Sequence, residues 1–228
     1  MREREFLRGP DDLLVDFDRA VHIFNEFVTG CRALNDLGPA VTVFGSARFD
    51  EDHRFYQLAR ETGRALAEAG YAVITGGGPG IMEAANRGAK EAGGVSVGCT
   101  IVLPHEQASN PYLDREIAFD YFFVRKVMLQ KYSRAFICMP GGIGTLDEIF
   151  ETGTLIQTEK LPSFPIVVMG VEYWQPLRNF IRGTMFGEGT ITEGEVVPYY
   201  SDDVAEVIAH IQAAEDWKRP SAGPTATP

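Results

Sequence analysis

The sequence predicts an α/β fold, a doubly wound parallel sheet with helices on both faces. Short apolar runs rich in strand formers alternate with longer amphipathic segments, and this alternation is typical of parallel strands joined by crossover helices. Three of the apolar runs end in glycine-bearing turns, and ligands bind such sheets at the carboxyl ends of the strands. A chain of 228 residues without an internal linker suits a single domain.

The same patterns place each element. Strands are expected at 40–45, 71–75, 95–103, 119–124, 135–139, 164–170 and 196–200. Helices are expected at 55–70, 81–92, 125–132, 173–184 and 202–217, with one more opening at Gly144 and Thr145. We therefore divide the chain into a helical extension at 1–38, a main domain at 39–217 and a disordered, proline-containing tail at 218–228. Asp11 and Asp12 can cap the extension, which we interpret as a packing or oligomer surface.

Composition excludes several classes of protein. The net charge of −11 argues against binding to nucleic acid or to acidic membranes. No apolar run reaches the ~20 residues of a membrane span, and the first residues lack the apolar core of a signal peptide. Cys31, Cys99 and Cys138 lack metal-site spacing and suit core thiols of a cytoplasmic protein. His105 and Glu106 have no third ligand nearby, so we predict no metal site.

The most informative stretch begins at the end of the strand expected at 135–139. Pro140, Gly141 and Gly142 stop the strand, and the helix that follows offers unpaired N–H groups that attract anions. Glu148 adds a carboxylate near that positive end. Two interpretations stay open at this point: Thr145 and Glu148 fit a capping box, which implies no chemistry, or Glu148 is a catalytic group.

Three glycine turns in one sheet suggest a ligand that carries a phosphate. They are Gly45-Ser46, Gly76 to Gly80, and Gly141 to Gly144. The dinucleotide fingerprint is absent because Ile81 stands at its last glycine, and no turn ends in the Gly-Lys-Ser/Thr of a P-loop. A mononucleotide or a sugar phosphate remains. We expect the turns to bind it through Gly45, Ser46, Gly77, Gly78, Gly80, Gly141, Gly142, Gly144 and Thr145.

Four segments together resemble one known family. The segment 140–148 (PGGIGTLDE) matches the P-G-G-x-G-T-x-x-E signature of the Lonely Guy family, cytokinin riboside 5′-monophosphate phosphoribohydrolases that are often mislabelled as lysine decarboxylases. The segments 44–48 (FGSAR), 76–83 (GGGPGIME) and 122–126 (FFVRK) agree in order and spacing. The likeness covers roughly residues 41–211.

This resemblance implies a Rossmann-like fold, a homodimer or larger assembly, and no cofactor. It also implies hydrolysis of the N-glycosidic bond of an adenine-type nucleoside 5′-monophosphate. The family's catalytic arginine and glutamate fall on Arg125 and Glu148, and its phosphate-binding elements on Gly78 and 141–145. The chain departs from short plant members at Phe122-Phe123, where they tend to carry Met-His. Either AMP or an N6-modified nucleotide therefore fits.

Elementary chemistry agrees with these two assignments. Cleavage of a ribosyl bond builds positive charge on the sugar, which a carboxylate can stabilise while it orients or deprotonates water. At a helix N-terminus we expect Glu148 to stay ionised. Arg125 is expected directly after a strand, where its guanidinium suits phosphate or ribose oxygens. Lys126 points about 100° away from it on a helix, so the two rarely serve one site.

The remaining candidates have alternative interpretations. Glu83 is a candidate for contact with the ribose unless it lies on a solvated face, and Arg48 for contact with the phosphate unless it pairs with an acidic neighbour. Met82 and Lys126 are further candidates for substrate contact. The whole protein also fits a nucleotide-binding or carrier protein without turnover, although such a protein needs no Glu148. A pyridoxal-dependent decarboxylase would need a pocket lysine, and Lys126 alone is near the expected site, without groups around it that bind pyridoxal.

Overall fold

A computed structural model describes residues 2–103, 108–161, 165–192, 194–195 and 198–214. Over these residues the chain forms a seven-stranded sheet in the order β4-β3-β2-β1-β5-β6-β7, and every neighbouring pair is parallel. The strands are β1 (Ala40–Phe44), β2 (Ala72–Thr75), β3 (Ser96–Ile101), β4 (Arg115–Phe119), β5 (Ala135–Cys138), β6 (Ile166–Val168) and β7 (Tyr199–Tyr200). The predicted doubly wound parallel fold is confirmed.

The strand order reverses between β1 and β5. The chain builds the sheet outward from β1 to β4, then returns to place β5 on the other side of β1, with Thr42 paired to Phe136. A crevice forms at the carboxyl ends of two strands whose crossovers leave in opposite directions. The turns after β1 and β5 therefore lie at the position where this fold class binds ligands.

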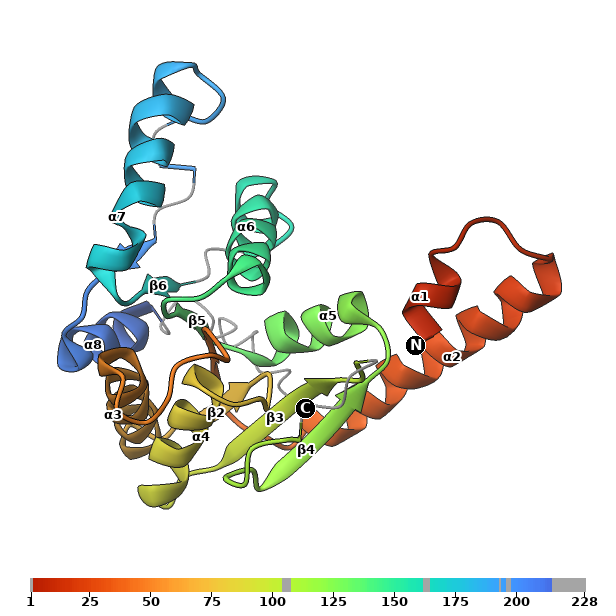
Figure 1. Cartoon of the computed structure of the whole chain (residues 1–228), viewed down its shortest axis with the longest axis horizontal. Helices are drawn as coiled ribbons and strands as arrows, with labels where there is room; N and C mark the ends of the chain where they lie inside the picture. Colours follow the sequence, from red (N-terminus) through yellow and green to blue (C-terminus); the bar gives the residue numbers. More distant parts are fainter. Residues whose placement is uncertain (1, 104–107, 162–164, 193, 196–197, 215–228) are drawn as a thin grey trace, which may run out of the picture.

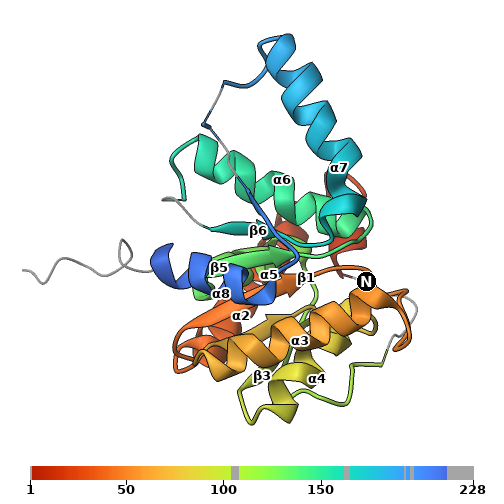
Figure 2. The ribbon, with the colours of Figure 1, turned by 90° about the vertical axis from the view of Figure 1, so that its left-hand side faces the viewer.

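Helices cover both faces of this sheet (Figures 1 and 2). One face packs on α3 (Arg54–Glu68), α4 (Ile81–Glu91) and α8 (Val204–Ala213). The other packs on α2 (Leu13–Leu34), α5 (Phe122–Tyr132), α6 (Ile143–Gln157) and α7 (Val171–Asn179). The remaining helices are α1 (Arg2–Phe6) and a π-helix, η1 (Phe180–Met185), that continues α7.

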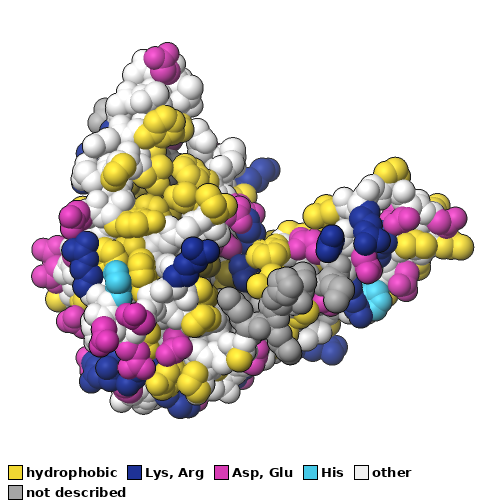
Figure 3. All heavy atoms as spheres, viewed as in Figure 1, with side chains coloured by type: hydrophobic (Ala, Val, Ile, Leu, Met, Phe, Trp, Pro, Cys, Tyr) yellow, Lys and Arg dark blue, Asp and Glu magenta, His cyan; other side chains and the backbone are white. Residues whose placement is uncertain are grey.

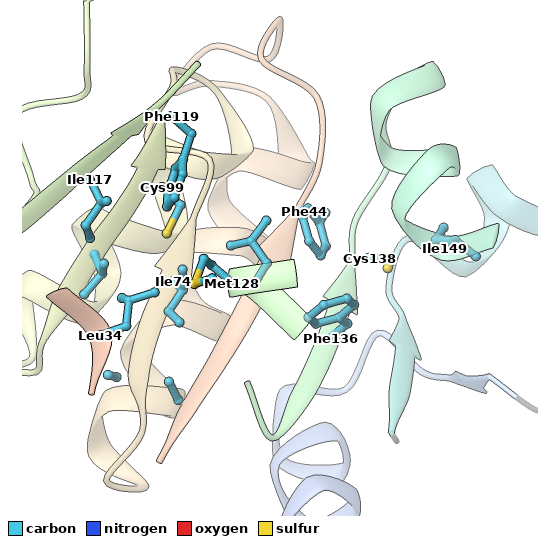
Figure 4. Close-up of a cluster of buried hydrophobic side chains, with 14 of the residues drawn as sticks. Leu34, Phe44, Ile74, Cys99, Ile117, Phe119, Met128, Phe136, Cys138 and Ile149 are labelled. Atoms are coloured by element: carbon cyan, nitrogen blue, oxygen red, sulfur yellow. The ribbon is translucent and has the colours of Figure 1, made fainter. Parts of the chain in front are cut away.

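The apolar core beneath α5 and α6 positions the catalytic candidates. Figure 4 shows Phe44 of β1 and Phe136 of β5 side by side, and their rings meet edge to face with centroids 4.9 Å apart. Cys138 and Ile149 lie in the same cluster. Aromatic pairs of this kind add to the free energy of burial, so the two strands that flank the crevice are packed firmly against each other.

The fourth expected strand was placed too late in the sequence. Phe119 to Val124 reads as a strand because it is rich in aromatic and β-branched residues, yet β4 ends at Phe119 and α5 begins at Phe122. Tertiary packing overrides such local preference. The other elements lie where expected, with ends that differ by a few residues. His105, Glu106 and the tail at 218–228 lie outside the described residues.

The N-terminal helices form an arm that extends from the body (Figure 1). Asp12 caps α2 as expected, and its side chain accepts a hydrogen bond from Leu14 N. The inner part of α2 packs against the core through Leu34. Its outer part leaves Leu14 (78%), Phe17 (68%) and Phe24 (65%) exposed, and apolar side chains gather on the arm in Figure 3. Among the described residues, none of the helices is long and apolar enough to span a membrane.

Candidate active site at the carboxyl edge of the sheet

The three glycine turns meet at one edge of the sheet, as predicted. Ser46, after β1, donates its backbone N–H to the carbonyl of Pro140, after β5, over 2.9 Å. The carbonyl of Ser46 in turn accepts from the N–H of Ile81, at the end of the turn that follows β2, also over 2.9 Å. One backbone carbonyl and one amide of Ser46 thus join all three turns.

Two glycines are required by how closely these turns approach one another. Gly80 has φ +69°, and a Cβ there would collide with the carbonyl oxygen of Ser46. A Cβ on Gly141 would collide with the hydroxyl of Thr145. Only glycine tolerates these positions without a shift of the backbone, so the motif glycines have a steric role in forming the site.

The start of α6 presents free amide groups. The helix begins at Ile143 with Gly142 as its N-cap, and no side chain accepts a hydrogen bond from its first N–H groups. Gly142, Ile143 and Gly144 are exposed. Uncapped N–H groups at a helix N-terminus attract anions. The capping-box interpretation is wrong, because Thr145 already lies inside the helix and Glu148 lies in its second turn.

Glu148 is instead buried beside Arg125. It is 1% exposed, and neither carboxylate oxygen has a hydrogen-bond partner among the described residues. Its Oε1 lies 3.7 Å from a terminal nitrogen of Arg125, whose side chain is 14% exposed. Arg125 occupies the first turn of α5 and not a strand end, and its guanidinium lies 5.1 Å from the ring centroid of Phe122.

Burial raises the pKa of Glu148 to about 7. The positive charges of Arg125 and Lys126 oppose this shift, whereas Glu151 and Asp147 add to it. The expectation that the helix terminus keeps Glu148 fully ionised is therefore wrong, since loss of solvation outweighs the dipole. A carboxyl that titrates near neutrality can both take up and release a proton under physiological conditions.

Lys126 also reaches α6, although it points elsewhere than Arg125. Its ammonium lies 2.7 Å from Asp147 and 2.7 Å from Glu151. Burial lowers the pKa of Lys126, but the hydrogen bonds to Asp147 and Glu151 raise it above its ordinary value overall. Arg125 and Lys126 thus contact different carboxylates of α6: Glu148 in the first case, Asp147 and Glu151 in the second.

The three weaker candidates lie around the turn after β2. Met82 packs over that turn, because a Cβ on either Gly76 or Gly78 would collide with its side chain. Glu83 accepts a hydrogen bond of 3.0 Å from the hydroxyl of Tyr56, which is buried. Arg48 is exposed on the turn after β1. Among the described residues, none of the three lies in contact with Glu148. Their roles toward a ligand stay predictions.

Sequence reasoning missed two residues that touch the turns. Tyr173, in the first turn of α7, donates a hydrogen bond of 2.9 Å from its hydroxyl to the carbonyl of Gly141. Asn110 donates from its side-chain amide to the carbonyl of Gly78 over 3.1 Å. Tyr173 could have been found from the sequence, because it lies at the start of the helix that follows β6, the strand next to β5. Asn110 gave none, because it lies in a loop far from Gly78 in the chain.

Comparison with known proteins finds one family to which the chain is similar over more than half of its length. A family model described as "possible lysine decarboxylase" matches residues 82–211. A Mycobacterium tuberculosis cytokinin riboside 5′-monophosphate phosphoribohydrolase is 37% identical over 100 residues, 43% of this chain and 54% of that protein. Its namesake from Rhodococcoides fascians is 32% identical over 161 residues, 67% of this chain and 78% of that protein.

Two more distant matches carry names of a different kind. A pyrimidine/purine nucleotide 5′-monophosphate nucleosidase of Escherichia coli is 27% identical over 214 residues, 85% of this chain and 45% of that protein. The chain thus spans about half the length of two of these three relatives. A solved structure of the molybdenum cofactor carrier protein of Chlamydomonas reinhardtii superposes with a TM-score of 0.55 at 25% identity, covering 78% of this chain and 98% of that one.

Proposed function

The chain belongs to the Lonely Guy family, and from that membership we propose that it hydrolyses the N-glycosidic bond of nucleoside 5′-monophosphates. The products are the free base and ribose 5-phosphate. The observation that carries the proposal is the buried pair of Arg125 and Glu148, 3.7 Å apart, beside the uncapped start of α6. A carboxylate buried without hydrogen bonds costs folding free energy, and catalysis accounts for why it is kept.

In the proposed complex the free N–H groups at the start of α6 hold the 5′-phosphate. The Gly76 to Gly80 turn closes around it, since Ser46 joins the two turns. Helix N-termini bind phosphate through backbone groups and the helix dipole. The ribose then extends along α6 toward Glu148, one turn further into the helix.

Glu148 acts at C1′ of the ribose. As the bond to the base breaks, the sugar gains positive charge, which the carboxylate stabilises. Water then attacks C1′, and Glu148 takes up the proton that the water loses, a role that suits a pKa of about 7. Arg125 keeps part of the Glu148 population ionised and offers N–H donors to ribose or phosphate oxygens. The bonding electrons leave with the base, which takes a proton from solvent, and Glu148 then returns its proton to solvent, so that one water is consumed overall.

The base is proposed to be adenine or an N6-modified adenine. The names of the relatives support a nucleoside monophosphate substrate, and an N6-modified nucleotide would yield a cytokinin base. The test is to incubate the protein with AMP, N6-isopentenyl-AMP, other nucleoside monophosphates and adenosine, and to measure the released base. Equal release from adenosine and AMP would refute the role of the 5′-phosphate.

One other function has a specific observation in its favour. The superposition with a cofactor carrier indicates that this fold also serves proteins named for binding. Tight binding of AMP without release of base, in the same assay, would support a carrier. The burial of Glu148 beside Arg125 favours the hydrolase, because binding alone gives no reason for a buried carboxylate without hydrogen bonds among the described residues.

The residues do not fit lysine decarboxylation. A Schiff base to pyridoxal phosphate needs a lysine that can become neutral. Lys126, the lysine beside Glu148, is held by Asp147 and Glu151, which raise its pKa. These two carboxylates oppose the chemistry that the family description names.

We further propose that the protein works as a homo-oligomer in the cytoplasm. The exposed apolar residues of the arm, Leu14, Phe17 and Phe24, supply a surface that a second copy can cover. Sedimentation should show an assembly larger than the monomer, and Phe17→Glu should dissociate it if this surface is used. The unpaired cysteines support the compartment, which fractionation of the source cells would test.

A further inference from the structure

A group of buried polar side chains lies behind the turn that follows β2. Thr75, Asn86 and Ser96 are fully enclosed, and Asn110 is 6% exposed. They come from the end of β2, from α4, from the start of β3 and from the loop before β4. We call these four residues the amide network.

Hydrogen bonds connect the amide network to the turn without a gap. The hydroxyl of Thr75 accepts from Gly77 N over 2.9 Å and donates to Asn86 Oδ1 over 2.5 Å. The amide nitrogen of Asn86 donates to Ser96 Oγ over 2.8 Å and to the carbonyl of Val97 over 3.4 Å.

Asn110 closes the amide network from the opposite side. Its backbone N–H donates to the carbonyl of Gly77 over 2.8 Å. Its side-chain nitrogen donates to the carbonyl of Gly78 over 3.1 Å and to Asn86 Oδ1 over 3.0 Å. Its Oδ1 accepts from Tyr112 N over 3.1 Å. Asn86 Oδ1 therefore receives two bonds, and both carbonyls of the central glycines are held.

These bonds determine the direction in which the N–H of Gly78 points. A trans peptide directs its C=O and N–H to opposite sides. Because Asn110 holds the carbonyl of Gly77, the N–H of Gly78 points away from the amide network. The next peptide is that of Pro79 and has no N–H. The amide network thus fixes the direction of the Gly78 N–H, a group of the turn that we place around the phosphate.

Stability alone does not explain four buried polar side chains. When both partners of a buried hydrogen bond are replaced by apolar groups, stability often changes little. Apolar residues at these sites would keep the packing of the core, but they would release Gly77 N and the carbonyl of Gly78, which the side chains of Thr75 and Asn110 hold. A turn that is already fixed, however, binds a ligand without the entropic cost of ordering it.

We infer that Thr75, Asn86 and Asn110 are positioning residues that hold the Gly76 to Gly80 turn in its phosphate-binding shape. This inference rests on the proposed function, because it takes from that proposal the phosphate at Gly78. It assigns to the amide network an effect on binding of the phosphorylated sugar, and none on the chemical step at Glu148.

The chain offers a matched pair of variants for the test. Thr75→Val removes the hydroxyl that holds Gly77 N and Asn86. Thr42→Val makes the same change on the neighbouring strand β1, where Thr42 is equally enclosed and its hydroxyl bonds Ser133 Oγ at 2.6 Å, remote from the turns. Each loses buried hydrogen bonds, so both should melt several degrees below the parent.

Binding of ribose 5-phosphate, measured by calorimetry, separates the two variants. We expect about tenfold weaker binding for Thr75→Val, the loss typical of one or two hydrogen bonds, and unchanged binding for Thr42→Val. Asn110→Ala provides a second variant if Thr75→Val does not fold. With AMP as substrate, Asn110→Ala should raise KM about tenfold, and kcat and the pH dependence of kcat should stay at parental values.

Three outcomes bear on the inference. Equal affinity of Thr75→Val and Thr42→Val for ribose 5-phosphate would overturn it, and so would a loss of kcat at unchanged KM in Asn110→Ala. A parent protein that binds no ribose 5-phosphate would overturn it as well. If the parent binds ribose 5-phosphate but releases no base from any nucleotide, the hydrolase proposal fails, and the comparison of affinities still decides the inference.

Discussion

Two regions of the candidate site treat buried polar groups in opposite ways. Behind the turn after β2, each side chain of the amide network is hydrogen-bonded to another member or to the backbone. Between α5 and α6, both oxygens of Glu148, Nε of Arg125 and the hydroxyl of Thr152 are buried without a hydrogen-bond partner within the described residues. Ser46 and the backbone of the glycine turns join the two regions.

Under the proposed function, the difference separates a region that binds from one that reacts. Satisfied buried groups stabilise one geometry, as a phosphate cradle requires. Unsatisfied groups cost folding free energy and have shifted pKa values, which is typical of catalytic sites. Substitutions in the amide network should therefore act on affinity, and substitutions between α5 and α6 should act on rate and on pH dependence.

The largest effect is expected for Glu148→Gln. Removing a charge that stabilises the transition state should lower the rate of base release from AMP by at least ~100-fold. Affinity for ribose 5-phosphate should persist, because glutamine removes a negative charge near the phosphate. Near-parental turnover would show that Glu148 is not catalytic. Glu61→Gln, which removes a carboxylate from the exposed face of α3, serves as the control.

The same variant should be more stable than the parent above neutral pH. The folded parent keeps a proton on Glu148 that the unfolded chain releases near pH 4.5, so folding free energy is lost as the pH rises from 4.5 to about 7 and the loss is complete above that pH. A pKa of about 7 corresponds to about 3 kcal/mol at most. In urea unfolding, the free energy of unfolding of Glu148→Gln should exceed that of the parent at pH 8 and equal it at pH 4. A constant difference would mean that Glu148 is not buried as described.

A smaller effect is expected when Lys126 is neutralised. Its charge lowers the pKa of Glu148, so Lys126→Gln should raise that pKa. If Glu148 works as a base, kcat/KM falls as pH drops through the pKa of Glu148, and this decline should begin at a higher pH in the variant. Lys131→Gln, at the other end of α5 beside Cys31, should leave the profile in place. A profile that moves to lower pH would contradict the proposed role.

The smallest effect is expected for Tyr173→Phe. The loss of one hydrogen bond to the carbonyl of Gly141 should weaken AMP binding about two- to fivefold. The rate at saturating AMP should stay within about twofold of the parent. Tyr132→Phe removes a comparable bond to the carbonyl of Cys31 and should change neither constant. A large loss of kcat in Tyr173→Phe would place Tyr173 with the reacting groups.

The binding region was largely predictable from the sequence. The periodicity of apolar residues gave the strands and helices, and parallel strands must bring the turns at their carboxyl ends to one edge. Gly80 and Gly141 were found because only glycine permits their approach. Four motifs in order then indicated the family, which the comparisons confirm.

The residues of the reactive region were predicted from the sequence, but the burial of Glu148 and its raised pKa were not. The sequence marks Glu148 as a group near a helix start, where local rules favour a cap or an ionised carboxylate. Its burial depends on α5, which packs against α6 only in the folded chain and begins where local composition favours a strand. Asn110 and Tyr173 were missed for a similar reason, since their hydrogen-bond partners are distant in sequence.

The bond between Ser46 and Pro140 also has a consequence for the order of synthesis and folding. Strands β1 to β4 are complete in the nascent chain before β5 and α6 emerge. Until β5 is made, any sheet that these strands form has an open edge at β1, which β5 covers in the folded chain. An uncovered strand edge is a template for pairing with other chains. The crevice that we propose for the nucleotide is therefore completed by the same late step that removes this hazard.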